Sequence, residues 1–197
     1  MQIAPITLQG SHVRLEPIAP EHAAGLFAAA SDDPTIFRWF TIAPPADRAG
    51  FDGFVADSCA RMAKGEHFTF VTHDQASGAI VGSSSYGSID RANRRLEIGW
   101  TWIRRSHQRS AVNTEAKLLM LENAFERLGC IRVEFKTHHR NEPSRRALAR
   151  IGAVEEGTFR NHMIMPDGSY RHSVYFSVID SEWPKVKAGL EGRLAAG

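Results

Sequence analysis

Alternating apolar and polar positions divide the chain into short strands and amphipathic helices. Residues 131–137 alternate strictly, because charged residues separate Ile131, Val133 and Phe135, and this pattern predicts a strand with one buried face. Residues 114–128 instead repeat with helical spacing. They predict a well-buried helix, whose inward face carries Leu118, Leu121, Phe125 and Leu128.

Further elements follow from the same periodicities and from turn and capping residues. Strands are predicted at residues 12–18, 67–72, 79–86, 94–103, 153–164 and 170–179, and helices at 20–30, 46–63, 142–152 and 181–195. Strict alternation in the strand 94–103 puts one set of side chains on one face (Leu96, Ile98, Trp100 and Trp102) and the rest on the other (Glu97, Gly99, Thr101 and Ile103).

The order of these elements predicts a single domain of the α/β (α+β) class over residues 1–197. Residues 94–137 form a strand–helix–strand unit whose strands should pair in parallel through a right-handed crossover, whereas residues 67–103 should form an antiparallel meander. The sheet is therefore expected to be mixed, mostly antiparallel and of about seven strands. A ligand site is expected where the strand 94–103 ends beside the following helix.

Composition narrows the class of function. Hydrophobic residues make up 43% and charged residues 23% of the chain, which is typical of a globular protein and excludes fibrous and wholly disordered chains. The net charge of +2 is too small for a duplex-binding surface, so no nucleic-acid partner is expected. Cys59 and Cys130 show no metal-ligand spacing, which predicts reduced thiols, a cytoplasmic location and no bound metal. No signal-peptide pattern and no apolar run of roughly 18 residues occurs, so no membrane partner is expected.

The junction before the helix 114–128 is basic and rich in small polar residues. Three arginines lie between positions 104 and 109, and the first N–H groups of the helix lack intrahelical acceptors. These N–H groups and the helix dipole favour an anion such as a pyrophosphate. An ordinary helix N-cap formed by Ser110 or Asn113, with solvated arginines, is an equally open interpretation.

Several segments, in this order along the chain, resemble one known family. They lie at residues 96–100, 108–119, 141–144, 151–153 and 167–179. The set is similar to the GNAT acetyltransferase superfamily, and within it to the RimJ/RimL-like branch of ribosomal-protein N-terminal acetyltransferases, over residues 7–180. The resemblance implies a twisted sheet that is flanked by helices and split near the cofactor site, with acetyl-CoA as the acetyl donor.

The resemblance also implies where acetyl-CoA binds. The family's phosphate loop corresponds to residues 108–113, where Ala111 and Asn113 replace two glycines. Backbone amides still bind phosphate through alanine, and asparagine tolerates left-handed geometry. Asn141 would hydrogen-bond the cofactor near a pantetheine amide. The backbone of Trp102, Ile103 and Arg104 would pair with the pantetheine arm, and the phosphates would be held by Gln108, Arg109, Ser110, Ala111, Val112, Asn113 and Thr114.

Acetyl transfer to an amine requires a neutral amine, donors to the developing oxyanion and a proton for the departing thiolate. Glu97 lies on the strand expected to face the thioester and is the candidate base. The alternative is an exposed strand glutamate paired with Arg94, Arg95 or Arg132. By resemblance, Ser144 is the candidate proton donor to the sulfur, and the alternative for it is N-terminal helix capping.

Candidates for the acceptor site come from two segments. The loop 31–45 carries Phe37 and Trp39, and in this family the loop forms one wall of the acceptor site, although core packing is the alternative for part of it. His162 and His172 are expected to face each other across the final hairpin. Either histidine could line the acceptor pocket, and an ordinary surface role is the alternative.

These observations and the resemblance together predict an acetyl-CoA-dependent N-acetyltransferase that acts on a primary amine by direct attack in a ternary complex. The amine is expected to be a protein N-terminal α-amine or a small-molecule amine, and the chain a monomer or a homodimer. The altered phosphate loop leaves one alternative, a non-catalytic acyl-CoA-binding or interaction module.

Overall fold

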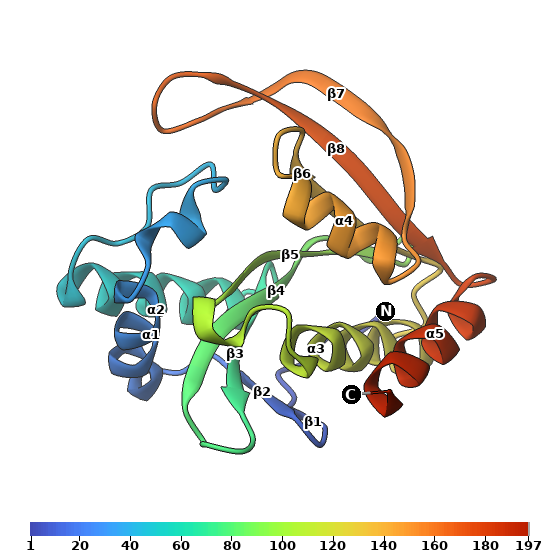
Figure 1. Cartoon of the computed structure of the whole chain (residues 1–197), viewed down its shortest axis with the longest axis horizontal. Helices are drawn as coiled ribbons and strands as arrows, with labels where there is room; N and C mark the ends of the chain where they lie inside the picture. Colours follow the sequence, from blue (N-terminus) through green and yellow to red (C-terminus); the bar gives the residue numbers. More distant parts are fainter. Residues whose placement is uncertain (197) are drawn as a thin grey trace.

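The computed structural model describes residues 1–196, which form an eight-stranded sheet in the order β1-β2-β3-β4-β5-β6-β8-β7 (Figure 1). The strands are β1 (Leu8–Gln9), β2 (Val13–Pro17), β3 (Phe68–Asp74), β4 (Ile80–Asp90), β5 (Arg95–Ile103), β6 (Arg132–His138), β7 (Val154–Ile164) and β8 (Tyr170–Ile179). The helices are α1 (Ala23–Ser31), α2 (Arg48–Ala63), α3 (Ala111–Glu122), α4 (Glu142–Arg150) and α5 (Trp183–Ala195). Shorter turns are η1 (Pro20–His22), η2 (Pro34–Phe37), η3 (Arg105–His107) and the π-helical turn η4 (Asn123–Arg127).

The predicted fold class and order of elements are confirmed. β5 and β6 pair in parallel on either side of α3 in sequence, whereas their other neighbours, β4 and β8, pair antiparallel with them. β1 is the strand that the sequence pattern missed, because two residues are too few to show alternation. α3 begins at Ala111 rather than at 114, since the Ser110 side chain accepts the Val112 N–H and caps the helix there.

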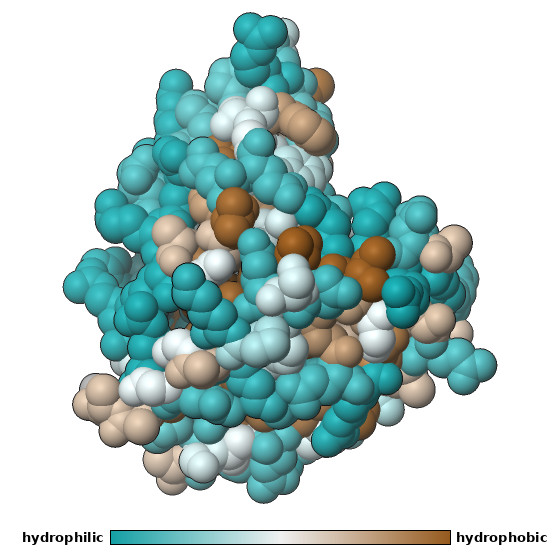
Figure 2. All heavy atoms as spheres, turned by 90° about the vertical axis from the view of Figure 1, so that its right-hand side faces the viewer, coloured by the Kyte–Doolittle hydropathy of each residue, from teal (hydrophilic) through white to brown (hydrophobic). Residues whose placement is uncertain are grey.

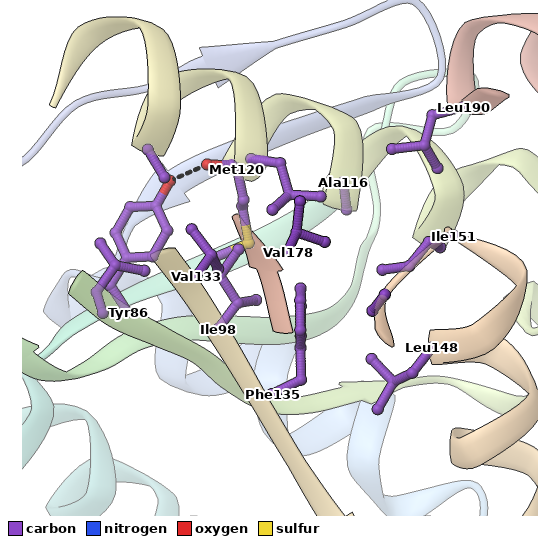
Figure 3. Packing of buried hydrophobic residues seen from close by; sticks show 14 of the residues in the cluster. Tyr86, Ile98, Ala116, Met120, Val133, Phe135, Leu148, Ile151, Val178 and Leu190 are labelled. Atoms are coloured by element: carbon purple, nitrogen blue, oxygen red, sulfur yellow. Dashed lines mark hydrogen bonds between the residues drawn. The ribbon is translucent and has the colours of Figure 1, made fainter. Parts of the chain in front are cut away.

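Two hydrophobic clusters place helices on both faces of the sheet. α1 and α2 pack on one face, in a cluster that includes Phe51 and Trp102. α3, α4 and α5 contribute to a larger cluster on the other face, which includes Met120 and Leu148 (Figure 3). The sheet is thus covered on both faces, and its hydrophobic side chains are buried in two layers.

The hairpin of β7 and β8 forms one edge of the sheet and arches away from the helices (Figure 1). β7 is exposed along almost its whole length, because as an edge strand it is supported by β8 on one side. The face drawn in Figure 2 is mainly hydrophilic, with hydrophobic residues in small separate groups.

The buried face of α3 and η4 carries the predicted residues together with one that was not predicted. Lys117 is buried, whereas Leu118 is only partly buried. The turn η4 widens the helix by one residue per turn, so residues after Glu122 do not continue the spacing of those before it. Lys117 is thus a buried position that the apolar pattern does not include, whereas Leu118 packs against the core as predicted.

A β-bulge in β5 reverses the predicted faces of two tryptophans. Gly99 lies opposite Ser85 and Trp102 opposite Ser83, so two residues of β5 face one residue of β4. Trp100, at the bulge, has a left-handed φ of 50°. Beyond the bulge the alternation is shifted by one, and Trp100 and Trp102 lie on the face that also carries Glu97. The prediction that they share a face with Leu96 and Ile98 is therefore wrong.

The same strand separates from β6 just before the bulge. Pairing between the two strands covers Arg95–Glu97 and Arg132–Glu134, although both strands continue beyond it. The predicted split in the sheet is therefore present, and it opens beside the N-terminus of α3.

Tyr86 ties β4 to the irregular end of α3. Its hydroxyl donates to the Met120 carbonyl at 2.6 Å and accepts from the Asn123 side-chain amide at 3.2 Å (Figure 3). The residue is fully buried, and burial raises the pKa of the phenol. The hydroxyl thus provides a hydrogen bond where the α-helical pattern changes to the π-helical turn.

Tyr86→Phe is expected to lower the free energy of unfolding by about 1–3 kcal/mol, because the Met120 carbonyl and the Asn123 amide lose a partner inside the core. Urea unfolding followed by circular dichroism measures this loss. Tyr170→Phe is the matched control, because Tyr170 is 64% exposed, and its midpoint should equal that of the wild type. Equal midpoints for Tyr86→Phe and the wild type would contradict the stabilising role of the buried hydroxyl.

Candidate active site

A pocket of about 900 Å³ opens where β5 and β6 diverge. Its walls come from the ends of both strands, the N-terminal part of α3, one side of α4 along its length, and the loop that follows η2. Met163 of β7 and Arg171 of β8 close the end that lies nearest to this loop. The pocket lies where the strand–helix–strand unit predicts a ligand site.

The α3 end of the pocket offers several groups for an anion. Arg109 and Ser110 line it, and the first turn of α3 begins there. Arg109 has a left-handed φ of 60°, whereas Asn113 is helical and does not use its tolerance for that geometry. The Asn113 side-chain oxygen is buried and has no hydrogen-bond partner within residues 1–196, so it is available to a ligand donor.

The last residues of β5 turn one backbone edge toward the gap. The Arg104 N–H donates to the Val81 carbonyl of β4 at 2.7 Å. Bonded pairs alternate along an antiparallel ladder, so the Ile103 N–H points away from β4 and toward the gap. The Gln108 side chain donates to the Ile103 carbonyl at 2.9 Å. Of the three residues expected to pair with a pantetheine arm, Ile103 thus turns its N–H toward the gap. The Arg104 N–H is used within the sheet, and the Arg104 side chain pairs with Asp32.

Glu97 lines the pocket beside the point where the strands separate, and it is 3% exposed. Its carboxylate lies 3.0 Å from Lys136 Nζ and accepts a hydrogen bond from Ser88 Oγ at 3.0 Å. The alternative of an exposed glutamate paired with an arginine is therefore wrong. Lys136 is the partner because β5 and β6 run in parallel here and both side chains project from the same face.

Asn141 and Ser144 lie together at the N-terminus of α4, and both line the pocket. The Asn141 side-chain oxygen accepts the Ser144 N–H at 3.2 Å and caps the helix. Asn141, rather than Ser144, is thus the capping residue. The Ser144 hydroxyl has no hydrogen-bond partner within residues 1–196, and it is half-buried.

The loop after η2 contributes one predicted aromatic residue to the pocket and one to the core. Trp39 lines the pocket and packs against His138, with ring centroids 4.6 Å apart. Phe37 packs against Trp102 in the α1–α2 cluster, at 5.3 Å between centroids. The alternative of core packing thus describes Phe37.

The histidines of the final hairpin do not face each other. His162 contacts Ser173 Oγ at 3.0 Å, whereas His172 Nδ1 accepts the Asn161 N–H at 2.8 Å. An irregular register between Phe159 and Met163 offsets them. His162 is exposed and lies outside the set of residues that line the pocket, and its part in acceptor binding stays a prediction.

Three charged residues of the pocket were not identified from the sequence: Lys117, Lys136 and Arg171. Lys136 is a polar residue of an alternating strand, so its side of β6 was predictable but its partner was not. Lys117 and Arg171 lie within segments that resemble the family, but their residue types do not show that folding buries them at 6% and 7% exposure. Burial lowers the pKa of Lys117 to about 7, because the charged amine loses its hydration.

A separate cluster of Glu16, His22 and His73 lies where β2 and β3 meet. His22 Nδ1 accepts the Ala19 N–H at 3.0 Å, so Nε2 carries the proton of the neutral ring and faces the Glu16 carboxylate at 3.3 Å. A protonated Nε2 is a hydrogen-bond donor and not a metal ligand, so this cluster is explained by hydrogen bonding.

Known proteins resemble the chain over most of its length. The family model described as "Acetyltransferase (GNAT) domain" matches residues 12–154. "Putative ribosomal N-acetyltransferase YdaF" of Bacillus subtilis is 34% identical over 110 residues, which span 56% of this chain and 59% of that relative. A GCN5-related N-acetyltransferase from Brucella melitensis is 36% identical, with a TM-score of 0.91 over 98% of this chain and 86% of the other. Mycobacterium smegmatis RimJ in complex with CoA-disulfide shares the fold, with a TM-score of 0.86 at 22% identity over 96% and 95% of the two chains.

Among residues 1–196, no helix has both the length and the apolar character needed to cross a lipid bilayer.

Proposed function

We propose, on the premise that this chain belongs to the GNAT acetyltransferase family and is an acyltransferase, that it transfers an acetyl group from acetyl-CoA to a primary amine. The acceptor class is a protein N-terminal α-amine or a small-molecule amine. The name of the Bacillus subtilis relative supports the first of these, and the match spans 59% of that relative.

The observation that carries the proposal is the gap between β5 and β6, which opens directly onto the N-terminus of α3. Arg109 and the first N–H groups of α3 fit the phosphates, and the Ile103 N–H, which points toward the gap, fits a pantetheine carbonyl. The buried Asn113 oxygen lacks a partner and can accept a hydrogen bond from the cofactor. The replacement of two loop glycines by Ala111 and Asn113 does not close the site, because both residues are helical and leave the pocket open.

Two residues on different walls of the pocket carry out the proton transfers, Glu97 of β5 at the amine and Ser144 of α4 at the sulfur. Bound acetyl-CoA would supply an acetyl group activated as a thioester. Glu97 takes a proton from the acceptor ammonium, directly or through water, and the amine nitrogen then forms the new C–N bond as the C–S bond breaks. The Ser144 hydroxyl, which has no partner within residues 1–196, donates a proton to the departing sulfur and takes in return, directly or through water, the second proton that the nitrogen loses as the amide forms. Lys136 holds the Glu97 carboxylate in place.

Isothermal titration calorimetry with coenzyme A tests the binding part of the proposal. Arg109→Glu is expected to weaken binding about 10-fold or more, because a negative charge replaces a positive one beside the helix N-terminus. Arg160→Glu is the matched control, since Arg160 lies on exposed β7 outside the pocket. If the wild type gives no heat of binding with millimolar coenzyme A, the proposal is refuted.

Release of free thiol from acetyl-CoA, measured with peptides and small amines, tests the transfer itself. Turnover with an amine supports the acetyltransferase. Tight binding of coenzyme A without turnover of any amine would instead favour the non-catalytic acyl-CoA-binding module. A cytoplasmic location is part of the proposal, and the two free thiols, Cys59 and Cys130, support it.

A further inference from the structure

Arg171 of β8 is the one arginine that is buried within residues 1–196, and it is 7% exposed. It lies opposite Met163 across the hairpin, and both residues line the pocket. Its Nε donates to Ser173 Oγ at 3.0 Å, and its Nη1 donates to the Trp39 carbonyl at 3.3 Å. In the described part of the chain, no carboxylate pairs with the guanidinium, and its other N–H groups have no acceptor.

Other arginines show how unusual this is in the molecule. Arg95, Arg104 and Arg132 are more exposed, yet each pairs with a carboxylate. A buried guanidinium without a counter-ion destabilises the fold, and burial accordingly lowers the pKa of Arg171. A cation that is kept at this cost, and that faces a pocket, is typical of ligand binding.

The other charged groups at this end of the pocket do not neutralise Arg171. Glu97 acts on Arg171 electrostatically, but Lys136 already pairs with that carboxylate. The ring of His138 is neutral at pH 7, because burial and the neighbouring His139 lower its pKa to about 4. Because Lys136 and Glu97 pair with each other, Arg171 is left without a carboxylate partner among residues 1–196, and a carboxylate on a ligand can pair with it.

We propose that Arg171 binds a carboxylate of the acceptor, which makes the substrate an amine that also carries a carboxylate. This inference rests on the proposed function and deepens it. The planar guanidinium matches a carboxylate through two parallel hydrogen bonds, and Glu97 lies in the same pocket to receive the proton of the amine. The α-carboxylate of a free amino acid and an acidic side chain near a peptide N-terminus offer the same chemistry.

Matched substrate pairs test the proposal and separate these two sources. One pair is leucine and leucinamide, and the other is a peptide amide beginning with aspartate and its asparagine counterpart. Thiol release from acetyl-CoA is expected to show kcat/KM about 10- to 100-fold higher for the carboxylate member of at least one pair. Arg171→Gln removes this preference, Arg171→Lys retains part of it, and the exposed control Arg160→Gln keeps it whole.

Direct binding and stability measurements complete the test. The same compounds are titrated into the protein saturated with coenzyme A, so discrimination is measured even without turnover. Arg171→Gln is expected to melt at or above the wild-type temperature, because an unpaired buried charge is removed; a purely structural arginine would show the opposite. A preference that is absent in the wild type, or that persists in Arg171→Gln, overturns the inference. Failure to bind coenzyme A overturns the proposed function instead, and calorimetry distinguishes the two.

Discussion

Glu97→Gln is expected to lower kcat/KM for acetyl transfer by about 100-fold or more, while the affinity for coenzyme A stays unchanged. Glutamine keeps the size of the side chain and can still accept from Ser88, but it cannot take a proton from the ammonium. Glu97 is 3% exposed, and among residues 1–196 it is the one carboxylate that lines the pocket. No other acid there can take over its role. Steady-state thiol release and calorimetry measure the two quantities separately.

The pH dependence distinguishes a base from a structural glutamate. As the pH rises toward the pKa of the acceptor amine, more amine is neutral without assistance, so the deficit of Glu97→Gln should shrink. Glu66→Gln is the control, because Glu66 is exposed at the turn between α2 and β3. A deficit that is the same at every pH, or a kcat/KM equal to that of the wild type, would refute the assignment of Glu97 as base.

Lys117→Met is expected to raise the melting temperature by about 2–8 °C at pH 7. Lys117 is 6% exposed, and its Nζ donates only to neutral groups, Thr101 Oγ1 at 2.8 Å and Ser84 Oγ at 3.1 Å. Ser84 and Thr101 also lie 2.7 Å apart and can bond each other once the amine is gone. Methionine fills a similar volume without a charge. Differential scanning calorimetry measures the shift, and exposed Lys185→Met should show none.

The gain from Lys117→Met should also depend on pH. Burial lowers the pKa of Lys117 from 10.5 to about 7 in the folded state. Between these values the unfolded chain binds a proton that the folded chain does not, so wild-type stability rises with pH. The advantage of the variant is therefore largest at pH 7 and below, and it shrinks toward pH 10.5. A variant that melts below the wild type at pH 7 would show that the hydroxyl contacts outweigh the buried charge.

Local patterns predicted the elements whose burial follows a regular period. In β6, Val133 and Phe135 are buried as expected. Ile131 instead precedes the strand and is 38% exposed, and Glu134 is buried. Prediction failed where an irregularity changes the period. The bulge at Trp100 reversed one end of β5, and the turn η4 replaced the predicted α-helical spacing beyond the end of α3. Neither irregularity is visible in the residue types alone, because each arises from how the element fits its neighbours.

The candidate site also contains residues that the sequence identified and residues that only the folded structure revealed. The segments around Glu97 and Ser144 could be identified by resemblance, and the structure places both residues on the pocket wall. Arg171 could not be identified, because its isolation from carboxylates is a property of the folded hairpin and of the loop that carries Trp39. These segments lie more than a hundred residues apart in the chain.

The sequence by itself determined the order and type of the elements, the parallel unit around α3 and the family, since these depend on periods and motifs within single segments. The tertiary structure alone decided that Lys117 and Arg171 are buried cations and that Lys136 is the partner of Glu97. The physical reason is that dehydration and pairing of a charge depend on atoms from strands and helices that meet only after folding.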